Sequence, residues 1–155
     1  MFEAKIHRYS KEYSGDASAA MDVGRIALLS LGFEIVSDTG SELHAHGPGM
    51  HSNQQPPLMG ATDFILQVGS STVAGTATLG GVARMKAFLY LFPPGLVLMF
   101  VIMGAFMEVE KFGYWLLFAV PWLFFASLMG RAMENQTIKA VDALICGMAQ
   151  AGARR

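Results

Sequence analysis

The chain has 155 residues, a formal net charge of −1 at pH 7 and a hydrophobic fraction of 53%. Because its charges nearly balance and form no basic block or stripe, the composition gives no indication of nucleic-acid binding. The single cysteine, Cys146, excludes an internal disulfide and suits a reducing compartment.

The first third of the chain predicts a strand followed by a helix. In Phe2–Tyr9 apolar residues alternate with polar ones, which is typical of a half-buried strand with Ile6 on its apolar face. Asp16 is placed to cap a helix over Ala17–Leu31, because its carboxylate can accept hydrogen bonds from the free N–H groups of the first turn. Gly32 is expected to end this helix in the left-handed conformation.

Four further strands are predicted between residues 33 and 79, from alternating or β-branched segments bounded by turn residues. They are Phe33–Ser37, Glu42–His46, Thr62–Val68 and Thr72–Leu79. The intervening segment Gly47–Gly60 contains three prolines and three glycines, and we expect a loop without regular structure. A loop of this length is often mobile or functional.

Two apolar runs, Ala87–Met107 and Phe112–Gly130, predict a transmembrane hairpin. At 1.5 Å per residue they would span roughly 31 and 28 Å, close to the hydrocarbon thickness of a bilayer. The link Glu108–Lys111 carries the only charged side chains between Ala87 and Gly130. The alternative is the buried core hairpin of a soluble protein, which would need the polar face that both runs lack.

The flanking charges predict the orientation of this hairpin. Arg84 and Lys86 precede the first run, and Arg131 and Lys139 follow the second, whereas the link has Lys111 alone beside two acids. The positive-inside rule then places both termini in the cytoplasm. Since the polar N-terminus has no targeting presequence, we expect a bacterial inner (cell) membrane and a two-pass protein.

Prolines predict interruptions within both runs. Pro93 and Pro94 are expected to separate an interfacial helix, Gly80–Leu91, from a spanning helix that begins near Pro94. Pro121 is expected to kink the second run. Beyond the hairpin, Ala132–Ala149 has apolar residues at three- and four-residue spacing and predicts a separate amphipathic helix.

The element order is therefore β-α-β-β-β-β, a membrane hairpin, and α. This order predicts an α+β fold in which a small antiparallel sheet of four or five strands has two helices on one face. The domain would comprise residues 1–86 and 131–155, interrupted by the two-helix transmembrane hairpin at residues 87–130. By element order alone, the layout resembles a helix-grip or TBP-like sheet.

Three histidines are the best candidates for a metal site. His44 and His46 are two residues apart on a predicted strand, so they project from one face with Cα atoms roughly 6.5–7 Å apart. Glu42 shares that face, and His51 follows in the predicted loop. Three imidazoles and a water molecule would complete a tetrahedral Zn²⁺ site. The alternative is an ordinary polar strand face, because no stronger metal motif accompanies these residues.

No catalytic residue, cofactor-binding motif or phosphate loop is predicted, and Asp22, Asp38 and Asp63 are interpreted as isolated, solvated carboxylates. We expect a non-enzymatic accessory or scaffolding subunit of a membrane complex, with a cytoplasmic docking domain. Its partners would be membrane lipid and either another protein or a second copy bound through the hairpin. One alternative is a tethered helix-grip-like domain that binds a lipid or small apolar ligand. A weaker alternative is a metal-dependent enzyme built on a metal site at His44, His46 and His51.

Overall fold

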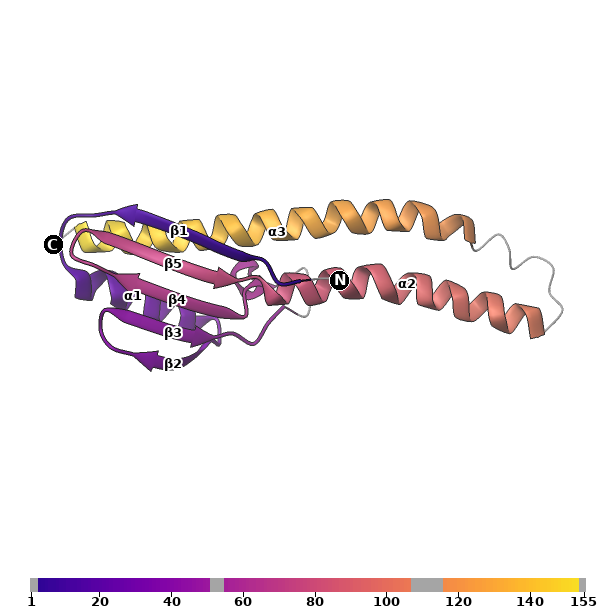
Figure 1. Cartoon of the computed structure of the whole chain (residues 1–155), viewed down its shortest axis with the longest axis horizontal. Helices are drawn as coiled ribbons and strands as arrows, with labels where there is room; N and C mark the ends of the chain where they lie inside the picture. The colour runs from indigo at the N-terminus through magenta and orange to yellow at the C-terminus, as the bar shows by residue number, and fades with distance from the viewer. Residues whose placement is uncertain (1–2, 51–54, 107–115, 154–155) are drawn as a thin grey trace.

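Five strands form one antiparallel sheet in the order β1-β5-β4-β3-β2 (Figure 1). This computed structural model describes residues 3–50, 55–106 and 116–153. The strands are β1 (Ile6–Glu12), β2 (Glu34–Asp38), β3 (Glu42–His46), β4 (Asp63–Val68) and β5 (Thr72–Thr78). The helices are α1 (Ala17–Ser30), the short 3₁₀ helix η1 (Pro57–Gly60), α2 (Gly80–Phe106) and α3 (Leu116–Ala153).

Both ends of α1 follow the local sequence. Asp16 caps the helix by accepting a hydrogen bond from the backbone N–H of Ser18 at 2.8 Å, as predicted. Gly32 follows the helix with a φ of +80°, the left-handed conformation expected at its end. The predicted helix therefore differs from α1 only at its last residue.

The core lies between the sheet and one layer of helices, which confirms the predicted α+β arrangement. Alternate residues of the central strands face α1 and the C-terminal half of α3. The largest fully buried side chains of this core include Phe64, Leu66, Leu43, Met21, Leu28, Ile145 and Met148. The opposite face of the sheet carries polar side chains and is open (Figure 1).

In strand β1 the side that packs against the helices is opposite to the side that was predicted to do so. Ile6 is 57% exposed, whereas His7 and Tyr9 face α3. The pairing with β5 explains the difference, because it sets Tyr9 opposite Gly75, where the space left by the missing side chain is filled by Ile145. The strand also begins four residues later than predicted, so its register is set by β5 and not by the apolar residues near Phe2.

The segment Gly47–Gly60 is not wholly irregular, which corrects the prediction. Residues Pro57–Gly60 form η1, and a proline at its first position suits the start of a helix, where a backbone N–H has no partner. Gly60 allows η1 to approach α3, because a Cβ atom there would lie 2.3 Å from Oγ1 of Thr137. His51 lies outside the described residues.

Helix α2 continues through Pro93 and Pro94, so the predicted break between an interfacial and a spanning helix is wrong. Pro93 has no N–H to donate to the carbonyl of Leu89, one turn earlier. The indole Nε1–H of Trp122 in α3 donates to that carbonyl at 2.9 Å instead. The neighbouring helix thus replaces the hydrogen bond that the proline removes.

Helix α3 is also continuous, although the sequence predicted two helices divided near Gly130. Residues 131–137 contain neither proline nor glycine, so nothing interrupts the backbone hydrogen bonds after Gly130. Both α2 and α3 project from the same end of the sheet domain, where they lie side by side (Figure 1). The predicted link Glu108–Lys111 lies outside the described residues.

Candidate functional site

One described helix, α2, is long and apolar enough to span a membrane. Within its segment Gly80–Ile102 the most apolar 18-residue window has a mean hydropathy of 1.8, and only 6% of that window is buried. A core helix of a soluble protein would hide such a surface, because exposing apolar area to water costs about 25 cal/mol per Å². Of the second predicted run, the structure describes the part from Leu116 onward, so the two-helix span remains a prediction.

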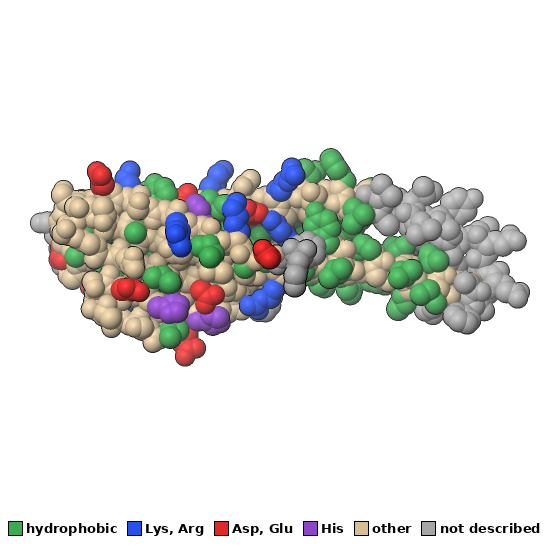
Figure 2. Space-filling view, viewed as in Figure 1, with side chains coloured by type: hydrophobic (Ala, Val, Ile, Leu, Met, Phe, Trp, Pro, Cys, Tyr) green, Lys and Arg blue, Asp and Glu red, His purple; other side chains and the backbone are tan. Residues whose placement is uncertain are grey.

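The outer parts of α2 and α3 expose large apolar side chains (Figure 2). Those at least half exposed are Phe88, Leu91, Phe92, Leu98, Met99, Ile102, Phe124, Phe125 and Leu128. Their number and size exceed the scattered apolar residues that are normal on soluble proteins. We call this surface the apolar belt.

Charged residues lie where the apolar belt meets the sheet domain. Lys5 donates to Oε1 of Glu134 at 2.9 Å, and Lys86 donates to Oε2 of the same carboxylate. These hydrogen bonds, first that of Lys86 and then that of Lys5, hold the pKa of Glu134 below its usual value. Arg84 in α2 and Arg131 in α3 lie close in sequence to Lys86 and Glu134, and we call these five residues the charged collar. Figure 2 shows charged side chains gathered between the sheet domain and the apolar part of the helices.

A second apolar cluster joins α2 to α3 beside the collar. Met50, Leu89, Ala126 and Met133 are its buried members. Trp122 packs against this cluster and donates its hydrogen bond to α2. The two helices are therefore fixed to one another at the edge of the domain, by packing and by a directional contact.

The open sheet face carries the candidate metal ligands. His46 lies opposite Asp63 on β4, with Nδ1 2.8 Å from Oδ1, whereas His44 lies opposite Ile65. This hydrogen bond lowers the pKa of Asp63. Across residues 3–50, 55–106 and 116–153, no group of three potential metal ligands occurs. The three-histidine site therefore gains no support, and its third member, His51, lies outside those ranges.

The interpretation of three carboxylates as isolated is wrong. Asp63 pairs with His46, and Asp22 and Asp38 both bind Arg25. Asp38 is the last residue of β2 and its carboxylate reaches Arg25 of α1, so this pairing depends on tertiary structure that the local sequence does not encode. These contacts are ion pairs on the surface, and they form no catalytic arrangement with one another.

The interior of the sheet domain is filled with side chains. Phe64, Leu66, Met21 and Ile145 are at most 1% exposed and occupy the space between the sheet and the helices. A ligand in the predicted helix-grip position would have to displace them. The hollows relevant to ligand binding lie instead at the surface, on α2 and near Arg84.

Comparison with protein-family models, with curated proteins and with solved structures found no match to this chain.

Proposed function

We propose that this protein is a non-enzymatic, two-pass membrane protein of a bacterial cell membrane, with both termini in the cytoplasm. The observation that supports it best is the sharp change along α2 from the charged collar to the apolar belt. Ala87 to Phe106 extends roughly 30 Å at 1.5 Å per residue, which matches the hydrocarbon core of a bilayer. Basic residues at its domain end fit the cytoplasmic surface.

The second span in this proposal is the outer part of α3. From Leu116 to Gly130 it extends roughly 22 Å, and the predicted run begins four residues earlier, at Phe112. Phe124 and Phe125 are more than half exposed and would face lipid, as the exposed residues of α2 would. The hydrogen bond from Trp122 to Leu89 supports joint insertion, because an unsatisfied carbonyl in hydrocarbon is costly.

The sheet domain would then serve as a docking module beside the membrane. Its open face has a hollow of about 480 Å³ that includes Arg8, Gln67 and Thr76. These side chains provide charge and hydrogen-bonding groups for a protein partner, in the manner of a polar interface. The protein would thereby be an accessory or scaffolding subunit.

A topology experiment tests the membrane arrangement. In a Cys146→Ser background, Ser70→Cys places a thiol on the exposed turn between β4 and β5, and Glu110→Cys places one in the predicted link. A membrane-impermeant maleimide added to intact spheroplasts should label the link thiol, and should label the Ser70→Cys thiol only after lysis. Release of the protein by alkaline carbonate, or the reverse labelling pattern, would refute the proposal.

The accessory role is tested by purification in mild detergent. The full-length protein should retain a protein partner in fixed ratio, and Arg8→Glu, which reverses the charge on the open face, should weaken that complex. Recovery of the wild-type chain from native membranes without any protein partner would contradict the docking role.

A further inference from the structure

We propose that α2 carries a binding site for one anionic phospholipid of the cytoplasmic leaflet. Arg84 would bind the headgroup phosphate, and one acyl chain would lie along Phe88, Phe92 and Leu96. This inference rests on the proposed function, because the site meets lipid only if α2 enters the bilayer.

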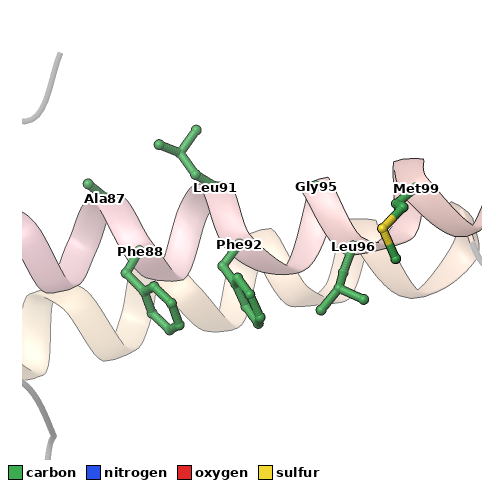
Figure 3. A pocket seen from close by; sticks show the side chains of 7 residues that line it. All are labelled: Ala87, Phe88, Leu91, Phe92, Gly95, Leu96 and Met99. Carbon is green, nitrogen blue, oxygen red and sulfur yellow. The ribbon is translucent and has the colours of Figure 1, made fainter.

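The acyl-chain part of the site is a shallow, open groove of about 530 Å³ on the outer surface of α2, formed between side chains of that helix. The described residues that line it are all apolar: Ala87, Phe88, Leu91, Phe92, Gly95, Leu96 and Met99. Phe88, Phe92 and Leu96 point to one side of the helix (Figure 3). The rings of Phe88 and Phe92 stack with centroids 4.8 Å apart and form a flat wall. Gly95 leaves open space, since a Cβ atom there would meet nothing within 4 Å.

The described lining of the groove is long enough for an acyl chain of one leaflet. From Ala87 to Met99 it extends roughly 18 Å along the helix axis. One leaflet contributes about 15 Å of the hydrocarbon core, which is half of the total thickness. An acyl chain of the cytoplasmic leaflet needs an apolar surface of about this length, and the described lining of the groove supplies it.

The headgroup part is a second hollow of about 220 Å³, lined by Met50, Arg84, Met85 and Phe88. It shares Phe88 with the groove, so both hollows border the same side chain. Arg84 lies four residues before Phe88 and therefore on the same side of α2. Its guanidinium lies beside the loop after β3, since a Cβ atom added at Gly49 would be 3.7 Å from Nη1 of Arg84.

The charge balance of the collar favours an anion at Arg84. Lys86, its neighbour, is neutralised by Glu134, but no acidic side chain within the described ranges pairs with Arg84. A guanidinium can bind two phosphate oxygens at once through parallel N–H groups, and the contact is stronger where water is partly excluded. A phospholipid supplies both parts: its phosphodiester would pair with Arg84, and its acyl chain would cover the apolar groove.

Lipid retention in defined nanodiscs tests this site. The full-length protein is reconstituted in phosphatidylcholine containing 10 mol% phosphatidylglycerol, then released in mild detergent for native mass spectrometry. We expect wild type to retain one phosphatidylglycerol per chain, and Arg84→Gln to reduce retention about tenfold. The matched control is Arg131→Gln, which removes an exposed collar arginine that does not line either hollow.

A groove-filling variant tests the acyl-chain part separately. Gly95→Leu should fold, because its Cβ would enter open space, but it should reduce phosphatidylglycerol retention while leaving Arg84 in place. Excess inorganic phosphate should not displace the lipid from the wild-type protein. If phosphate displaces the lipid equally from wild type and from Gly95→Leu, the site binds free phosphate and the proposal is overturned.

Two further outcomes separate the proposals. If Arg84→Gln and Arg131→Gln lower retention equally, general collar charge explains binding and the lipid site is refuted, while membrane insertion stands. If the wild-type protein does not enter nanodiscs and is released by carbonate, the proposed function itself fails, and the lipid site with it.

Discussion

The sheet domain and the apolar belt contain the same kinds of side chain in opposite surroundings. Phe64 in β4 is fully buried, whereas Phe124 in α3 is 70% exposed. In the strands apolar residues alternate with polar ones, so one face can be removed from water and the other hydrated. Along α2 beyond Lys86 apolar residues occupy every side, so no packing of this chain alone would cover them. Composition therefore sets how much apolar surface exists, and periodicity sets whether the fold can bury it.

The largest difference in stability between the two regions is expected from a matched pair of phenylalanine truncations. Phe64→Ala removes a ring that packs edge-on against Phe33 at 5.4 Å, and we expect a loss of about 3–5 kcal/mol in the free energy of unfolding. Phe124→Ala should change it by less than about 1 kcal/mol in detergent, because its ring is already exposed. Urea unfolding followed by circular dichroism measures both. Similar losses would show that the belt is packed like the core.

A second test concerns the junction between α1 and α3. Gly15 has a φ of +149°, and a Cβ atom there would lie 2.0 Å from the carbonyl oxygen of Gly152. Gly15→Ala should therefore destabilise the domain by about 2–4 kcal/mol. Gly40→Ala is the control, because Gly40 has a φ of +82° with nothing near its Cβ position, so strain alone should cost about 1 kcal/mol. Equal losses in thermal melts would contradict the close contact.

The helix pair is tested by a double-mutant cycle. Trp122→Phe removes the N–H donated to the Leu89 carbonyl and should cost about 1–2 kcal/mol. Pro93→Ala supplies a backbone N–H for the same carbonyl, so Trp122→Phe should cost much less in a Pro93→Ala background. The readout is denaturation of the protein in detergent. Additive effects would mean that Trp122 does not compensate for the proline.

The smallest expected effect is a pH dependence at the charged collar. Because Lys86 and Lys5 lower the pKa of Glu134 in the folded state, its stabilisation is complete above the ordinary pKa of 4.5 and is lost as the pH falls through the lower folded-state pKa. Glu134→Gln should cost about 1 kcal/mol at neutral pH and should flatten the decline in melting temperature below pH 4.5. An unchanged acid profile would exclude this contribution.

Local sequence patterns predicted the elements of the sheet domain well, because strand alternation and helix caps depend on neighbouring residues. Glu42–His46 was predicted with its observed bounds, and Asp16 with its capping role. The continuity of α2 was not predictable in this way, because the donor that compensates for Pro93 is Trp122, far along the chain. The face of β1 likewise depends on Gly75 in β5.

For the candidate site too, features set by local sequence were predicted, and features set by tertiary contacts were missed. The apolar residues of α2 and the basic residues beside it were evident from the sequence and predicted a membrane boundary. The hollow at Arg84 was missed, because it requires Met50, from the loop after β3, to lie beside α2. The pairing of Asp63 with His46 was missed for the same reason: it depends on the register between two strands.

Because α3 is one continuous helix, a tilt of its outer part would also displace the part that packs against the sheet. One continuous helix extends from the apolar belt to the end of the sheet domain, and the close approach of Gly15 to Gly152 holds its far end against the start of α1. The part from Arg131 to Ala153 is roughly 33 Å long. In the proposed arrangement, a change of about 20° in helix tilt, within the range seen for membrane helices, would swing that end sideways by about 11 Å. A change in bilayer thickness would thereby move the open sheet face as a unit. The docking surface would then shift sideways relative to the membrane.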